Sequence, residues 1–365
     1  MRITIGILAF ALILVILWEA FETIILPRRV SRRFRLTRLF YVITWMPWAA
    51  TARIIKNRKK RESLLAYFGP LSLLLLLVFW GGCLMLGFAL LQWSGGSVLT
   101  AQDGRPSDLW TDLYMSATTF FTLGLGDVIP KSVFARAVTA VECGTGFGFL
   151  AALIGYLPTT YQSFSRREAN ISLLDARAGS PPSASEILKR DAQSGDSSTL
   201  TQLLADWERW AADILESHIS YPVLCYFRSQ HDNQSWLSSL TAILDVCALA
   251  IVGVERIPAW QARLTFAMAR HAMVDIAQVF GRKPKKALAD RLPPEKLEVL
   301  RELLASEGVT VCNSPSLEKR LTELRAMYEP YVAELSEFLL MDLPDWMPKA
   351  GAKDSWKTAA GTVGH

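Results

Sequence analysis

The chain has 365 residues, of which 51% are hydrophobic and 20% charged, and its mean hydropathy is +0.23. This composition excludes a disordered chain, a collagen and a long coiled coil. The net charge of +5 is uneven, because residues 1–161 carry sixteen basic and eight acidic side chains whereas residues 162–365 carry a small acidic excess. Twelve basic residues lie between Pro27 and Arg61, among hydrophobic segments. This placement is typical of a cytoplasmic loop in a membrane protein, so no nucleic-acid partner is expected.

Residues 3–26 form the first apolar segment. It does not resemble a secretory signal peptide, because the basic cluster follows the apolar run and no small-residue cleavage site comes after it. We predict a retained membrane helix that ends on the cytoplasmic side. Glu19 and Glu22 then lie near the inner interface, within reach of Arg28 and Arg29, as interfacial anchors or as part of a gate.

Residues 39–55 are apolar, interrupted by Pro47 and flanked by basic residues on both sides. This pattern predicts an interfacial or re-entrant helix on the cytoplasmic face. The strongest membrane span covers residues 64–93. It lies in an uncharged run, residues 63–102, which is about twice the length needed to cross a bilayer as a helix. The basic residues at 58–61 favour the cytoplasmic side for the start of this span, so the span runs toward the outer side of the membrane.

Residues 107–121 are typical of a short helix, which Ser107 can cap. Residues 122–130 are rich in glycine and predict an irregular segment. The last clear span is residues 137–157, ended by Pro158 and followed by basic residues. The charges agree with one topology in the plasma (inner) membrane: N-terminus outside, three spans, a re-entrant segment on the outer side, and a cytoplasmic C-terminal half.

The sequence TLGLGD at residues 122–127 follows the short helix directly. Two glycines separated by one residue allow alternating backbone conformations, which turn successive carbonyl oxygens the same way. Several copies around an axis would stack rings of oxygens that replace the water shell of a cation. The Thr122 hydroxyl adds another oxygen layer, and the C-terminal end of the preceding helix also favours a cation.

Residues 64–161 contain, in order, an outer helix, a short helix, a T-x-G-L-G-D loop and an inner helix. This segment resembles the pore-loop potassium channels, especially two-pore-domain and related bacterial channels. The resemblance implies an all-α membrane protein in which four filters surround one K⁺-conducting pore. The implied K⁺-coordinating positions are Thr122, Leu123, Gly124, Leu125 and Gly126. The resemblance also implies that Asp127 lies at the outer mouth and that Thr118 and Thr119 brace the filter.

One loop per chain predicts a homotetramer in the lipid bilayer, or a pore shared with a sister subunit. Leu125 stands where Tyr is commonest in such filters, and Phe121 where a second Thr is usual. Two alternatives therefore stay open: a non-selective cation channel, and a membrane-anchored interaction protein with a vestigial pore loop. No cofactor is expected apart from K⁺ as the permeant ion. No catalytic residue is predicted, because the sequence has no nucleophile-elbow, zinc-protease or phosphate-loop motif.

The inner span carries Gly144, Gly146, Gly148 and Gly155. Each glycine costs about 1 kcal/mol in a helix interior, so several of them need a reason. They provide a bending point for a gate or allow close packing through small residues, and the sequence favours neither. Glu142 is an intramembrane carboxylate in the same span. It either faces the cavity and attracts cations or forms a hydrogen bond behind the filter.

From residue 162 the composition is that of a soluble protein. The predicted organisation is an N-terminal helix with its basic segment (1–63), the pore module (64–161), a linker (162–199), an all-α cytoplasmic regulatory domain (200–350) and a disordered tail (351–365). Helical patterns cover residues 200–217, 236–253, 259–280, 294–306 and 317–340.

Residues 236–254 carry one charge, Asp245, and could form a fourth span. A buried bundle helix is the preferred interpretation, because no basic block prepares for a further crossing. A cytoplasmic ligand is expected but not identified, since no dinucleotide-binding glycine motif follows residue 162. Residues 228–235 are interpreted as a loop in preference to a ligand pocket.

His218, His231 and His271 do not have metal-ligand spacing. The five cysteines have no paired spacing either and are interpreted as reduced structural thiols.

Overall fold

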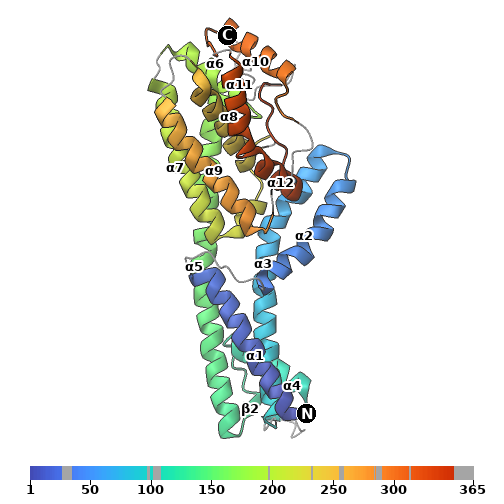
Figure 1. Cartoon of the computed structure of the whole chain (residues 1–365). Coiled ribbons are helices and arrows are strands. Elements are labelled where there is room, and N and C mark those ends of the chain that lie inside the picture. Colours follow the sequence, from blue (N-terminus) through green and yellow to red (C-terminus); the bar gives the residue numbers. More distant parts are fainter. Residues whose placement is uncertain are drawn as a thin grey trace, which may run out of the picture. The chain divides into compact units, whose positions relative to one another are not determined.

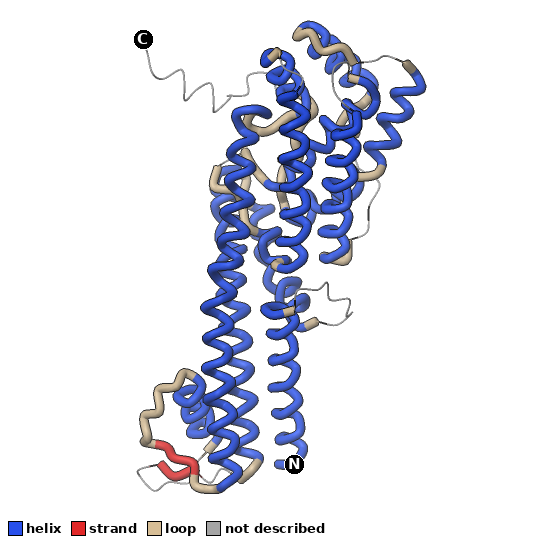
Figure 2. Tube along the Cα trace, turned by 90° about the vertical axis from the view of Figure 1, so that its left-hand side faces the viewer, coloured by secondary structure: helices blue, strands red, loops and turns tan. Residues whose placement is uncertain are grey.

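The computed structural model describes residues 1–26, 35–96, 99–101, 108–195, 198–231, 233–254, 259–282, 284, 290–311 and 314–348. Helices dominate these residues, and the strands present form one short antiparallel pair (Figures 1 and 2). The prediction of an all-α membrane protein is therefore confirmed. Ser107, Arg28, Arg29, Cys312 and the tail predicted at 351–365 lie outside the described residues.

The chain divides into two compact units. The first unit consists of residues 1–51 and 70–161, and the second of residues 52–69 and 162–365. The first apolar helix therefore groups with the predicted pore module and does not form a separate N-terminal domain. Among the described residues, four helical segments are long and apolar enough to cross a membrane: Arg2–Ile25, Arg58–Ser94, Val133–Ala178 and Trp236–Gly253.

The described residues of the first unit form α-helices, a π-helical turn and a strand pair. In chain order they are α1 (Arg2–Ala20), the π-helical turn η1 (Phe21–Ile25), α2 (Leu36–Ile54), α3 (Arg58–Ser94), β1 (Leu99–Ala101), α4 (Leu109–Phe120), β2 (Val128–Pro130) and α5 (Val133–Ala178). The last residues of α2, the first of α3 and the last of α5 belong to the second unit.

An apolar core joins α1, α3, α4 and α5 within the first unit. Its buried side chains include Ile13, Trp80, Phe120 and Val138. A Cβ atom on Gly87 would lie 2.7 Å from Cγ1 of Ile13, so this glycine lets α1 approach α3 closely. Small residues at such contacts are the usual device of membrane helix pairs, where lipid gives no hydrophobic drive for association.

Buried carboxylates fix the end of α1 to the start of α2. Oε2 of Glu19 accepts hydrogen bonds from the backbone N–H of Thr37 at 3.1 Å and from its hydroxyl at 2.8 Å. Glu22 accepts from the indole of Trp18 at 2.7 Å and lies 3.9 Å from Arg35. Because Glu19 binds a free N–H group in the first turn of α2, its role in this structure is that of an anchor.

Helices α2 and α5 each continue through a proline. Pro47 lies inside α2, and α5 continues past Pro158 to Ala178, so the prediction that Pro158 ends the inner span was wrong. An internal proline removes one backbone hydrogen bond, which for Pro158 is the bond to the carbonyl of Ile154. The neighbouring Thr159 and Thr160 donate side-chain hydrogen bonds to the carbonyls of Gly155 and Tyr156.

The predicted linker at 162–199 is also corrected. Residues 162–178 belong to α5, and residues 184–194 form α6 (Ala184–Ser194), whose first turn is capped by Ser183. The turn between them is packed, because the N–H of Ser183 binds the carbonyl of Ala178 at 3.0 Å and both residues are buried. Residues 196 and 197 lie outside the described part of the chain.

The second unit is a bundle of helices. Its elements after α6 are α7 (Ser198–Ser220), the 3₁₀ turn η2 (Pro222–Tyr226), α8 (Trp236–Gly253), α9 (Ala259–Val279), α10 (Pro294–Ser306), α11 (Pro315–Ala326) and α12 (Glu329–Leu339). The helix expected at 317–340 is divided in two, because Pro330 has no N–H to continue a helix from Ala326 and is tolerated only in the first turn of α12.

Helix α8 is the central helix of this bundle. Sixteen of its 18 residues are buried, and it contacts α6, α7, α9, α11 and α12. Its apolar surface is therefore covered by protein, as expected for the bundle interpretation of residues 236–254. Residues 228–231 and 233–235 form no helix or strand, which agrees with the loop expected there.

A buried charge cluster ties α8 to the C-terminal part of the bundle. Asp245 is 0% exposed, and its carboxylate accepts hydrogen bonds from Arg291 at 2.6 and 3.1 Å and from the Tyr328 hydroxyl at 2.5 Å. Arg291 also donates to the carbonyl of Pro344 at 2.8 Å. Removing one partner from such a pair leaves an uncompensated buried charge.

We expect Arg291→Met to lower the free energy of unfolding by about 3–5 kcal/mol, since Asp245 would lose its counter-charge without access to water. The matched control is Arg320→Met. Arg320 pairs with Glu323 at 3.2 Å on the surface, where a pair contributes about 0–1 kcal/mol. Denaturant unfolding of the detergent-purified chain measures both changes, and equal changes in the two variants would contradict the role of the buried cluster.

Candidate functional site

Helix α4 positions the glycine-rich loop. It is capped by Asp108, whose carboxylate accepts a hydrogen bond from the backbone N–H of Thr111 at 2.8 Å. The cap predicted from the sequence, Ser107, lies one residue earlier. A carboxylate at this point also complements the positive end of the helix, which leaves the partly negative C-terminal end facing the loop.

The end of α4 and the start of the loop share hydrogen bonds. The backbone N–H of Thr122 binds the carbonyl of Thr119 at 2.9 Å, and that of Leu123 binds the carbonyl of Thr118 at 2.8 Å. The Thr118 hydroxyl instead bonds to Met115 within α4, at 3.0 Å. The contacts of Thr118 and Thr119 with the loop are therefore made by their main-chain oxygens.

The loop has the alternating backbone that its sequence suggests. Thr122, Gly124 and Gly126 have positive φ angles of 57°, 57° and 78°, whereas Leu123 and Leu125 between them do not. Glycine adopts this region without strain, but for threonine it is unfavourable and needs support from the surroundings. Alternation of this kind is the arrangement that turns successive carbonyl oxygens toward one side.

One side of the loop is left uncovered by this chain. Leu123 and Leu125 are 62% and 63% exposed, and Phe121 is 48% exposed. None of the three bears a polar side chain, so from residues 121–126 a cation can be offered only main-chain oxygens and the hydroxyl of Thr122.

A tyrosine holds the far end of the loop. The Tyr114 hydroxyl on α4 donates a hydrogen bond of 2.8 Å to Oδ2 of Asp127, and the other carboxylate oxygen accepts from the backbone N–H of Val128 at 3.1 Å. Sequence reasoning predicted no partner for Tyr114. Its partnership with Asp127, 13 residues away, follows no local periodicity and needed the folded geometry.

Glu142 does not face a cavity. It is 1% exposed and forms a hydrogen bond with Ser116 of α4, so of its two predicted environments the structure shows the one behind the loop. The Ser116 hydroxyl also lies 2.7 Å from the carbonyl oxygen of Met85 on α3. Sequence reasoning missed Ser116, because a serine inside a helix has no distinctive pattern.

The glycines of α5 divide into two kinds. A Cβ atom on Gly146 would lie 2.1 Å from the carbonyl oxygen of Phe120, so Gly146 permits close packing of α4 on α5. A Cβ atom on Gly144, Gly148 or Gly155 would meet nothing within 4 Å of this chain. A bend at these positions stays a prediction.

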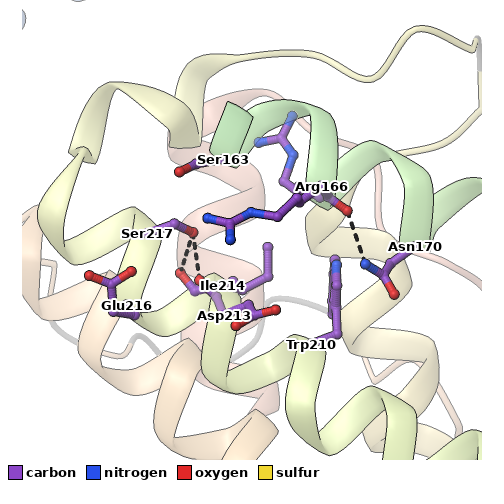
Figure 3. Close-up of a pocket in the computed structure, with 9 residues that line it drawn as sticks. Ser163, Arg166, Asn170, Trp210, Asp213, Ile214, Glu216 and Ser217 are labelled. Carbon is purple, nitrogen blue, oxygen red and sulfur yellow. Dashed lines mark hydrogen bonds between the residues drawn. The ribbon is translucent and has the colours of Figure 1, made fainter. Parts of the chain in front are cut away.

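A small pocket lies between α5 and α7 in the second unit (Figure 3). Its lining mixes both signs of charge, with Arg166 on α5 and Asp213 and Glu216 on α7. The indole N–H of Trp210 is buried there without a hydrogen-bond partner in the described chain. The pocket is too small for a nucleotide, and we assign no ligand to it.

No group of three or more metal-binding side chains comes together among the residues that the structure describes. His231 and His271 are exposed and His218 is buried, in separate parts of the second unit. Cys83, Cys143, Cys225 and Cys247 are free thiols.

We expect Gly146→Ala to destabilise the protein by about 1–3 kcal/mol, because the added methyl group would collide with the Phe120 carbonyl and displace α4. Gly144→Ala is the matched control on the same helix. There the methyl group meets no atom of this chain, and the helix gains about 1 kcal/mol of intrinsic preference. Thermal unfolding followed by circular dichroism measures both, and a stabilised Gly146→Ala variant would refute the close contact.

Comparison with known proteins identifies the segment that contains this loop. Residues 74–163 match a protein-family model described as an ion channel. The matched segment contains most of α3, the whole of α4, the loop at 122–127 and the part of α5 that packs on α4. No curated protein and no solved structure matches the chain significantly.

Proposed function

We propose that this chain, whose residues 74–163 form an ion-channel domain carried on apolar membrane helices, is a potassium-selective channel. The observation that supports K⁺ most directly is the alternation of positive φ at Thr122, Gly124 and Gly126. Stacked carbonyl rings from such loops replace the hydration shell of a desolvated cation. The proposed ligands of K⁺ are the main-chain oxygens of Thr122, Leu123, Gly124, Leu125 and Gly126, with the Thr122 hydroxyl.

A closed pore needs several copies of the loop, and each chain supplies one. We therefore propose a homotetramer, in which the exposed leucines of the loop are covered by neighbouring copies. The proposed orientation has the N-terminus outside and the second unit in the cytoplasm, because the basic residues between Pro27 and Arg61 favour the inner side. The proposed location is the plasma (inner) membrane.

A non-selective cation channel is the second candidate. Neither Leu125 nor Phe121 can donate the side-chain hydrogen bond that would tie the middle of the filter to α4. The bond from Tyr114 to Asp127 ties only its outer end. A weak tie at this outer end would favour the non-selective channel.

We expect a reversal potential near the K⁺ equilibrium potential when the purified protein separates opposed K⁺ and Na⁺ gradients in a bilayer. Gly124→Asp should abolish this current, because it places a side chain and a strained φ in the loop. Gly96→Asp is the matched control, since Gly96 also has a positive φ and open surroundings but lies outside the loop. Wild-type current that reverses near zero would support the non-selective channel.

Absence of current in the wild type has a different consequence. If it persists after the residues beyond Ser165 are deleted, the protein is better explained as a membrane-anchored interaction protein. If deletion restores the current, the second unit holds the channel closed.

We also propose that the second unit regulates the pore, because both helices that flank the loop continue into it. Residues 58–69 of α3 and residues 162–178 of α5 are part of the second unit. Segment 224–228, which covers the end of η2 and the two residues after it, contacts both of them. We refer to it as the clamp segment.

Arg167 connects α5 to the clamp segment. Its guanidinium is 2% exposed and donates hydrogen bonds to the carbonyls of Leu224 at 2.8 Å and Phe227 at 2.9 Å, while it pairs with Glu168 at 2.9 Å. Burial, together with the nearby Arg167 charge, holds the pKa of His218 well below its usual value. His218 is therefore neutral at pH 7 and does not compete for these acceptors.

The same segment also connects to α3. The Phe227 ring lies 2.6 Å from the position that a Cβ atom on Gly69 would occupy, and the Tyr226 ring centre is 5.1 Å from that of Phe68. Arg228 lies 3.7 Å from Glu62 and donates to the carbonyls that end α12. A rearrangement of the bundle that moves the clamp segment would therefore act on α3 and α5 together.

We expect Arg167→Gln to change the open probability of the channel by about tenfold or more. Each hydrogen bond from a charged group contributes about 1.5–3 kcal/mol, and 1.4 kcal/mol corresponds to a factor of ten. Arg301→Gln is the matched control, because Arg301 pairs with Glu318 at 2.8 Å in the same unit, without contact to the clamp segment. Single-channel recording measures both, and an unchanged open probability in Arg167→Gln would argue against the coupling.

A further inference from the structure

We infer that Glu142 carries its proton and is the positioning residue that, through Ser116, holds α4 between the two helices flanking the filter. That Glu142 contributes to ion selectivity rests on the proposed function. The protonated state of Glu142 and its contacts between helices do not rest on that function, because they follow from the hydrogen bonds themselves.

Three helices meet at the Ser116 hydroxyl. Its oxygen lies within hydrogen-bond distance of the Met85 carbonyl on α3, at 2.7 Å, and of Oε1 of Glu142 on α5. Ser116 and Glu142 are each 1% exposed. The junction therefore has no access to water that could replace a missing partner.

The number of hydrogens at this junction decides the state of Glu142. A serine hydroxyl has one hydrogen to donate, and a backbone carbonyl can only accept. If Ser116 donates to Met85, the bond to Glu142 needs a hydrogen from the carboxyl group. An ionised carboxylate is acceptor-only, so it could be satisfied only by leaving the Met85 carbonyl without this donor.

Burial supports the same conclusion. No ion pair to Glu142 is present among the residues that the structure describes, so an ionised carboxylate would lie in the apolar interior without a counter-charge. A buried carboxylate without a counter-charge is strongly unfavourable. A neutral carboxylic acid satisfies all three groups at once: Glu142 donates to Ser116, and Ser116 donates to Met85.

The contact also sets the register of α4 on α5. Glu142 meets Ser116, and four residues later on both helices Gly146 meets the carbonyl of Phe120. Residues four apart lie on the same face of a helix, so the two contacts form one continuous strip. The loop begins two residues after Phe120, and the carbonyls that hold its first N–H groups belong to Thr118 and Thr119, between the two contacts.

Glu142→Gln and Glu142→Leu separate this role from simple filling of space. Glutamine keeps the shape, the neutrality and an N–H donor for Ser116, whereas leucine keeps most of the volume but removes the donor. Gln92→Leu is the matched control. Gln92 is a buried side chain of α3 that bonds to α5 at the Ala135 carbonyl and the Thr139 hydroxyl, both at 3.1 Å, but not to α4.

The first readout is the ratio of K⁺ to Na⁺ permeability in purified full-length tetramers. We expect Glu142→Gln to keep the wild-type ratio, Glu142→Leu and Ser116→Ala to lower it by at least about tenfold, and Gln92→Leu to leave it unchanged. The double variant with Glu142→Leu and Ser116→Ala should have the same permeability ratio as Glu142→Leu alone, because both substitutions remove the same hydrogen bond. Selectivity retained in Glu142→Leu, or lost equally in Glu142→Gln, would overturn the positioning role.

The second readout does not require ion conduction. The infrared difference spectrum between wild type and Glu142→Gln should contain a carbonyl band of a protonated carboxylic acid that shifts in heavy water. A carboxylate band in its place would overturn the protonated state. If the protein conducts no K⁺ while the acid band is present, the proposed function fails but the inferred state of Glu142 stands.

Discussion

The close contact between the last turn of α4 and the middle of α5 is the constraint on which the segment matched as an ion channel depends. At Gly146 the backbone of one helix lies where any side chain would collide with the Phe120 carbonyl. The same strip of α5 carries Glu142, which is bonded to Ser116. The loop at 122–127 starts where this contact ends, so its backbone is supported from behind by main-chain atoms and one buried carboxyl group.

The supports of the loop act in different ways along its length. At its start, carbonyls of α4 hold the N–H groups of Thr122 and Leu123, which offsets the unfavourable φ of Thr122. At its end, the Tyr114 hydroxyl holds Asp127. Between them, Leu125 has an apolar side chain, which provides no hydrogen bond from the middle of the loop to α4.

Local sequence patterns were sufficient for much of this domain. The apolar spans, the short helix and the glycine loop could be predicted because each is a run or motif with its own physical meaning. The partners of that loop could not, because the pairs Tyr114 with Asp127 and Ser116 with Glu142 are 13 and 26 residues apart and belong to no helical repeat. The continuation of α5 past Pro158 could not be predicted either, because a proline can end a helix or remain inside it at the loss of one hydrogen bond.

The second unit shows a similar limit of sequence reasoning. Its helices α7 to α10 follow apolar periodicity closely, whereas residues 162–199 resembled a linker because they are rich in serine and small residues. Their burial comes from partners elsewhere in the chain, as when the N–H of Ser185 binds the carbonyl of Trp346. No local pattern records such a partner.

The second unit is assembled from two separate stretches of sequence, and this has a consequence for how the protein is made. Leu65 and Phe68, at the start of α3, are 0% and 2% exposed. During synthesis they leave the ribosome more than ninety residues before Gln162, the first residue of the larger stretch. The apolar side chains at the start of α3 therefore have no partner from the larger stretch until it is translated, while the rest of α3 is already entering the bilayer. A C-terminal fragment that begins at Gln162 lacks these side chains and has an open apolar face, which would need a detergent or a chaperone to remain in solution.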